Sequence, residues 1–108
     1  MPVVAWIVFL AAALLEVAGD AVIRSGLRSG SALLIAGGFV ALGCYGIVVN
    51  TVRWDFSRLL GAYVSVFALV SVLFGRIVFH ETVASSTWIG VAIILVGGLV
   101  VQLGPLLE

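Results

Sequence analysis

The chain has 108 residues, of which 64% are hydrophobic and 9% are charged, and its formal net charge is zero. Soluble domains carry about 25% charged residues, so this composition argues against a soluble domain. A net charge of zero gives no indication that the protein binds nucleic acid or another polyanion. Almost all of the chain must lie in a lipid bilayer, and we expect an all-α integral membrane protein.

Four apolar stretches are long enough to cross the roughly 30 Å of hydrocarbon in a bilayer. They cover residues 3–23, 32–52, 59–79 and 86–106. Lipid offers no hydrogen-bond partners, so each stretch must be a helix whose backbone groups bond internally. The connections are short, and we therefore expect one four-helix transmembrane domain over residues 1–108.

The first stretch carries Glu16 a few residues from its centre. A carboxylate at that depth costs about 2.5–3.5 kcal/mol on insertion scales, so such an acid is a functional candidate by default. Spacings of three and four place it on a small and polar stripe. The other members of this stripe are Ala12, Ala13, Gly19, Asp20 and Arg24. Residues roughly opposite are predicted to face lipid: Leu10, Leu14, Val17 and Ala21. The spacing of Asp20 and Arg24 favours a salt bridge.

The second stretch contains four glycines, which bending and close packing would explain equally well. The arginines give almost no orientation signal. Arg53 and Arg58 lie on one side of the membrane, and Arg24, Arg28 and Arg76 on the other. Two alternatives follow: the chain inserts both ways up, or the small excess places the first and third loops in the cytoplasm.

The third stretch carries a seam of small residues at spacings of three and four, which allows helix backbones to approach closely in lipid. The seam comprises Gly61, Ser65, Ala68, Ser71 and Gly75. Plain helix packing would explain it, and so would the wall of a binding chamber. In the second case Tyr63 would offer a ring face and a hydroxyl to a cationic ligand.

The fourth stretch repeats glycine every seven residues, at Gly90, Gly97 and Gly104, with Gly98 beside the middle one. Such a groove suits a crossing helix, and we interpret this helix as an oligomerisation element, with packing inside the chain as the alternative.

Catalytic chemistry has no basis in the sequence. We find no metal-ligand cluster, no pair of nucleophile and base, and no cofactor motif, so we expect neither an enzyme nor a cofactor or metal site. The adjacent His80 and Glu81 are interpreted as a solvated pair in the third loop.

Several local patterns together resemble the small multidrug resistance family of the drug/metabolite transporter superfamily. The run from Glu16 to Gly19, followed by Arg24 and Ser25, looks like the first-helix motif of that family. The spacing of Gly90 and Gly97 resembles its fourth-helix dimerisation motif. Two features depart from the pattern: the third helix begins without proline or glycine, and Asp20 is an additional acid.

The resemblance implies a proton-coupled antiporter that exports cationic small molecules across the bacterial inner membrane. It implies an antiparallel homodimer of dual topology. The additional acid Asp20 would widen the anionic site and favour guanidinium-like or polyamine-like compounds. We expect a proton and substrate site of Glu16, Asp20, Tyr63 and Ser65, and a dimer contact at Gly90, Gly97 and Gly98. Carboxylates from two copies would titrate as a coupled pair and hold either protons or a cationic substrate.

Two other functions remain open. A flippase subunit for a lipid-linked substrate would bind an anionic phosphate, so Arg24, Arg28 or Arg58 would matter more than Glu16. A structural or regulatory membrane subunit would form a parallel or hetero-oligomeric assembly and would show no substrate-dependent proton release.

Overall fold

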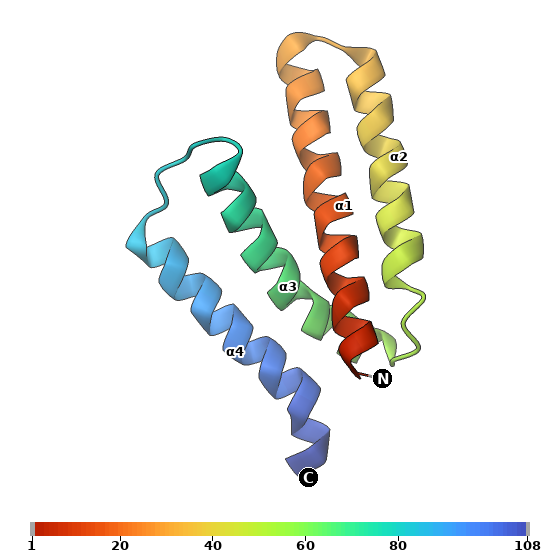
Figure 1. The fold of residues 1–108 in the computed structure, drawn as a ribbon, viewed down its shortest axis with the longest axis vertical. Helices are drawn as coiled ribbons and strands as arrows, with labels where there is room; N and C mark the ends of the chain where they lie inside the picture. Colours follow the sequence, from red (N-terminus) through yellow and green to blue (C-terminus); the bar gives the residue numbers. More distant parts are fainter. Residues whose placement is uncertain (1, 108) are drawn as a thin grey trace. The chain divides into compact units, whose positions relative to one another are not determined.

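A computed structural model describes residues 2–107 of the protein and the side chains of residues 3–104. Four α-helices follow one another along the chain (Figure 1): α1 (Pro2–Ser29), α2 (Ala32–Val49), α3 (Phe56–Ile77) and α4 (Ser85–Leu107). All four are long and apolar enough to cross a membrane. The prediction of an all-α membrane protein with four transmembrane helices is confirmed.

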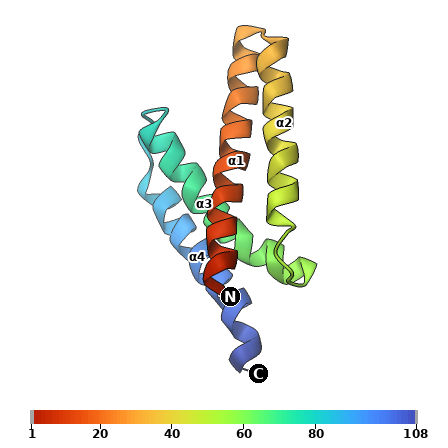
Figure 2. The ribbon, with the colours of Figure 1, turned by 45° about the vertical axis from the view of Figure 1, so that its right-hand side comes forward.

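The chain divides into two compact units, residues 1–52 and residues 53–108. Each unit is an antiparallel helical hairpin, because α1 packs against α2 and α3 packs against α4. The two helices of each hairpin stay side by side in both views (Figures 1 and 2). The assembly of all four helices into a single domain stays a prediction.

The first helix is longer than predicted. It continues past Ile23 to Ser29, so most of the expected loop 24–31 is helical. The sequence from Arg24 to Ser29 contains no helix breaker other than Gly26, and it remains helical until Gly30 adopts a positive φ of 71°. That conformation is accessible to glycine without a steric penalty. Ser31 then caps α2, and its hydroxyl accepts a hydrogen bond from the N–H of Leu34 at 3.3 Å.

The second helix ends at Val49, three residues before the predicted boundary. Two polar side chains donate hydrogen bonds to carbonyls of the last turn and so stabilise the end of the helix. The Asn50 amide donates to the Gly46 carbonyl, and the Thr51 hydroxyl donates to the Val48 carbonyl, each at 2.7 Å. In the other hairpin, α3 begins at Phe56, three residues earlier than predicted, and ends two residues early at Ile77.

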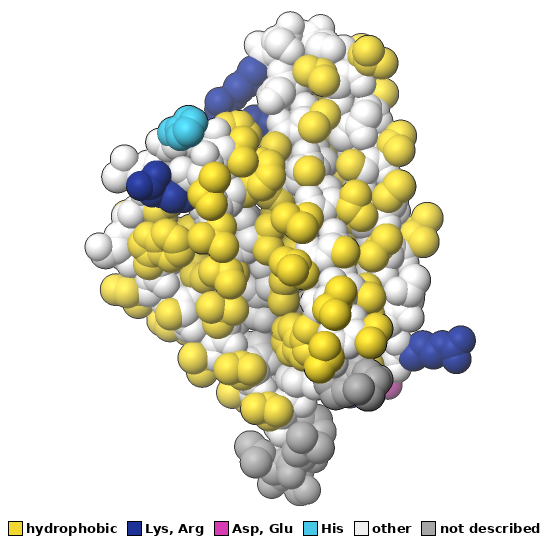
Figure 3. Space-filling model, in the orientation of Figure 1, with side chains coloured by type: hydrophobic (Ala, Val, Ile, Leu, Met, Phe, Trp, Pro, Cys, Tyr) yellow, Lys and Arg dark blue, Asp and Glu magenta, His cyan; other side chains and the backbone are white. Residues whose placement is uncertain are grey.

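Large hydrophobic side chains are exposed on all four helices. Leu33, Ile47 and Ile93 have exposed fractions of 84%, 73% and 66%. Figure 3 shows hydrophobic side chains over much of the drawn face, with the cationic side chains at its margins. Water would not tolerate apolar surface on this scale, whereas lipid acyl chains would cover it.

Candidate functional site

Small residues on both helices let α1 and α2 lie close together. A Cβ built at Gly19 would lie 3.0 Å from a methyl group of Leu42, and one built at Gly38 would meet Ile23 and lie 2.9 Å from the Gly19 carbonyl oxygen. Three facing pairs define this α1–α2 seam: Gly19 with Leu42, Ile23 with Gly38, and Gly26 with Ile35. Each step of three or four residues along α1 is matched by an equal step back along α2.

The next pair in the same register is Glu16 and Tyr45. Glu16 precedes Gly19 by three residues, and Tyr45 follows Leu42 by three residues. The seam therefore brings the acid in the middle of α1 together with a tyrosine from α2.

Both members of this pair are partly accessible. Glu16 and Tyr45 are half-buried, as are Leu42, Ile23 and Ile35 elsewhere in the seam. The next positions toward the end of α2, Ala12 and Val49, are 0% and 1% exposed. The two polar groups thus lie at a partly accessible position of the seam.

The predicted stripe of α1 divides into a buried part and an exposed part. Ala12, Ala13 and Gly19 are buried, Glu16 is half-buried, and Asp20 and Arg24 are exposed. The salt bridge predicted between Asp20 and Arg24 stays a prediction, as does the place of Asp20 in a binding site.

One lipid-facing residue was predicted wrongly. Leu10 and Leu14 are exposed as expected, at 49% and 50%, but Val17 is only 7% exposed. The physical reason is a second buried row along α1. Its members follow one another at spacings of four: Ala5, Phe9, Ala13 and Val17. The helix therefore buries a wider arc than its polar stripe indicates.

Ser65 and Gly98 form a close contact between α3 and α4. A Cβ built at Gly98 would lie 2.5 Å from the Cβ and the Oγ of Ser65. Ser65 is 3% exposed, and its hydroxyl donates to the Ala62 carbonyl at 2.7 Å. The binding role of Ser65 and the dimerisation role of Gly98 stay predictions.

The remaining predicted residues of this hairpin have separate surroundings. Tyr63 is 3% exposed, and its ring centroid lies 6.4 Å from that of Phe67. Its binding role stays a prediction. A Cβ built at Gly90 or Gly97 would meet nothing within 4 Å, so both positions are open to another helix or to lipid. Their role in dimerisation also stays a prediction.

Arg58 links the start of α3 to α4. Its Nη2 donates to Oε1 of Gln102 at 3.0 Å, and its guanidinium carbon lies 4.3 Å from the ring centroid of Trp54. The buried Nε of Arg58 has no hydrogen-bond partner among the residues that the structure describes. Gln102 was not predicted as a partner of Arg58, although a lone amide near the end of an apolar helix was the available signal.

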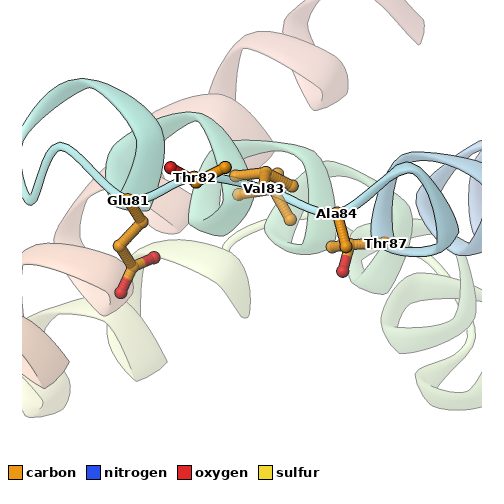
Figure 4. Close-up of a pocket in the computed structure, with 6 residues that line it drawn as sticks. Glu81, Thr82, Val83, Ala84 and Thr87 are labelled. Atoms are coloured by element: carbon orange, nitrogen blue, oxygen red, sulfur yellow. The ribbon is translucent and has the colours of Figure 1, made fainter.

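A hollow of about 510 Å³ lies beside the loop between α3 and α4. It is lined by Val72, Glu81, Thr82, Val83, Ala84 and Thr87. Figure 4 shows that the side chain of Glu81 points away from that of Thr82. The Glu81 carboxylate lies over Gly75, and the backbone N–H of Glu81 donates to the Gly75 carbonyl at 3.1 Å. No cluster of three potential metal ligands occurs within the described part of the chain.

Comparison with known proteins identifies the family. The sequence profile described as "Uncharacterised BCR, YnfA/UPF0060 family" matches residues 3–106. The chain belongs to the YnfA/UPF0060 family. Membership of the small multidrug resistance family, which the local motifs resemble, stays a prediction.

Relatives in this family are similar over almost their whole length. A UPF0060 membrane protein of Saccharopolyspora erythraea is 36% identical over 104 residues, which cover 92% of each chain. The UPF0060 membrane protein YfjF of Bacillus subtilis is 32% identical over 108 residues, covering 97% of this chain and 98% of the relative. No solved structure matches the chain. These names and the four apolar helices make the protein a multi-pass integral membrane protein of bacterial type.

Tyr45 is the residue of this site that sequence reasoning missed. Its partnership with Glu16 depends on the register between α1 and α2, and that register depends on the length of the connection. Once α1 is known to reach Ser29, only two residues separate the helices, and Tyr45 falls opposite Glu16. The predicted connection of eight residues, from 24 to 31, did not place Tyr45 opposite Glu16.

Proposed function

We propose that this member of the YnfA/UPF0060 family is a proton-coupled transporter of small cations, in which Glu16 binds protons and cargo in alternation. The observation that carries the proposal is the position of Glu16. It is a half-buried acid in the middle of an apolar helix, on the side that faces α2. A carboxylate retained at such a depth needs a function that offsets its cost of insertion.

The chemistry of exchange follows from one carboxylate with two kinds of ligand. A proton and a cation cannot both neutralise the same charge, so each displaces the other. Coupling then requires only that the site opens to the two sides of the membrane in turn. Asp20, one turn away on α1 and exposed, would add negative charge on the route to the site.

The proposal includes a homodimer of inverted copies. Two features support it. The near balance of arginines on the two sides of the membrane permits insertion in both orientations. The open positions at Gly90 and Gly97 give α4 a smooth surface on which a second helix could pack. Two inverted copies would place two Glu16 carboxylates in one pathway.

The test uses purified protein in liposomes with a pH gradient, and it measures uptake of radiolabelled guanidinium. We expect Glu16→Gln to abolish gradient-driven uptake while the protein still inserts and elutes as the same oligomer. Glu16→Asp should retain exchange with a lower pH optimum, since the ordinary pKa of aspartate lies about 0.4 below that of glutamate.

The matched control is Glu81→Gln, which makes the same change in an exposed loop residue. We expect this variant to transport like the unaltered protein. Equal uptake by Glu16→Gln and Glu81→Gln would refute the proposal.

A lipid-linked substrate is the second candidate, and one observation favours it. Arg58 is a half-buried cation whose Nε lacks a hydrogen-bond partner within the described residues, and phosphate oxygens would supply one. Transport of a phosphate-bearing lipid that survives Glu16→Gln and fails in Arg58→Gln would replace the first candidate with this one.

A further inference from the structure

The position of Glu16 in the α1–α2 seam offers a ligand more than a charge. The register of the seam places Tyr45, with its aromatic ring and hydroxyl oxygen, opposite Glu16 on α2. Both side chains are half-buried, so part of each remains accessible. A ligand that reaches the carboxylate therefore meets the phenol as well.

These two groups prefer a particular class of cation. A carboxylate accepts several hydrogen bonds, and a phenol oxygen accepts one or two. A planar cation with several N–H donors can bind both acceptors at once, as guanidinium does with paired oxygens. A quaternary ammonium has no N–H group, so it can interact only with the charge and with the face of an aromatic ring.

We propose that Tyr45 is the specificity-determining residue of this site, and that its hydroxyl selects cations carrying N–H donors over quaternary cations. The inference rests on the proposed function, because it assumes that Glu16 binds a cation. It adds a residue that the family resemblance did not supply and a chemical criterion for the cargo. The ring of Tyr45 provides affinity for either class of cation, and the hydroxyl provides the preference.

The helices packed against each other in this hairpin present few other charged or titratable groups to the pair. On α1, Asp20 lies one turn from Glu16 and is exposed, and Arg24 lies one turn farther and is also exposed. On α2, Cys44 precedes Tyr45 and is exposed. Tyr45 is thus the titratable side chain that α2 directs toward the acid in this register.

Binding can be measured at Glu16 itself, without transport. The chain contains three glutamates, at positions 16, 81 and 108, so labelling glutamate with carbon-13 at the carboxyl gives three signals. Glu16→Gln identifies the signal of interest. Protein in lipid nanodiscs is titrated with guanidinium chloride and, separately, with tetramethylammonium chloride at constant ionic strength. The shift of the Glu16 signal gives a Kd for each probe.

We expect Tyr45→Phe to weaken guanidinium binding about tenfold, which is the effect of losing one hydrogen bond to a charged group. Tetramethylammonium binding should change less than about twofold, because phenylalanine keeps the ring face. The selectivity ratio therefore falls by about the same factor as guanidinium affinity. Cys44→Ala, at the neighbouring exposed position on α2, is the control and should leave both constants unchanged.

Three results separate the possible failures. Equal weakening of both probes by Tyr45→Phe, or no weakening of either, overturns the role of the hydroxyl while Glu16 remains a cation site. Loss of selectivity in Tyr63→Phe, with selectivity intact in Tyr45→Phe, assigns the specificity to the tyrosine predicted from sequence and also overturns the proposal. A Glu16 signal that ignores both probes in the unaltered protein overturns the proposed function instead.

Discussion

Replacing Gly98 with alanine inserts a methyl group into the contact between α3 and α4. The new Cβ would lie 2.5 Å from both the Cβ and the Oγ of Ser65, whereas ordinary contacts begin at 3.4 Å. Rotation of the Ser65 side chain would move only its hydroxyl oxygen, so the overlap between the new Cβ at position 98 and the Cβ of Ser65 would remain. The two helices must therefore part by about 0.9 Å at this point, which is the difference between the two distances.

Gly97→Ala, at the neighbouring glycine, provides the reference for the free-energy cost of Gly98→Ala. Overpacking a close contact costs about 1–3 kcal/mol. Alanine is the better helix former by up to about 1 kcal/mol, and this gain applies equally to Gly97→Ala, where the new Cβ would meet nothing within 4 Å. The difference between the two variants isolates the steric effect. We expect Gly98→Ala to be less stable than Gly97→Ala by about 1–3 kcal/mol, or roughly 5- to 150-fold in the unfolding constant.

The assay is unfolding by sodium dodecyl sulfate in mixed micelles, followed by energy transfer between dyes at exposed positions 55 and 103. Measurements at several protein concentrations separate hairpin stability from any contribution of dimerisation at Gly97. The double variant Ser65→Gly with Gly98→Ala should recover most of the loss, because it removes the opposing Cβ. Equal stability of Gly98→Ala and Gly97→Ala would refute the steric argument.

Two further predictions concern single turns and contacts. Gly30→Ala should destabilise the α1–α2 hairpin by about 1 kcal/mol, because a φ of 71° is unfavourable for alanine. The control is Gly37→Ala, where a built Cβ would meet nothing within 4 Å, and this variant should be neutral or stabilising. The same unfolding assay compares the two variants, and equal effects would contradict the argument. Gln102→Leu should destabilise the α3–α4 hairpin by about 1–3 kcal/mol, because Arg58 loses the acceptor for its Nη2; an unchanged unfolding midpoint would show that water replaces the amide.

The number and type of the helices could be predicted because composition in a bilayer leaves few alternatives. Apolar stretches of about 20 residues must be helical, and their approximate places follow from hydropathy alone. The helix ends were less predictable. The polar residues from Arg24 onward predict that the first helix ends at Ile23. Polar residues continue a helix readily, however, and the turn depends on the backbone conformation of Gly30.

The central acid of the candidate site was predictable, but its partner was not. Glu16 is conspicuous because of its cost in lipid, which is a property of one residue in its own segment. Tyr45 gains meaning only from the register of two helices, which depends on Gly19, Gly38 and a turn of two residues. Ser65 carried a valid signal for close contact, but the sequence could not distinguish a packed hydroxyl from a ligand-binding one.

The shortness of α2 places Tyr45, the partner of Glu16 in the seam, at very different distances from the two ends of its helix. Tyr45 lies four residues before the end of α2 at Val49 and thirteen residues after its start at Ala32. At 1.5 Å per residue, these separations are about 6 Å and about 20 Å along the helix axis. The phenol thus lies about one helical turn from the Asn50 end of α2 and between three and four turns from the Ser31 end. In the proposed exchange, a route along α2 to this position would consequently be much shorter from one end of the helix than from the other.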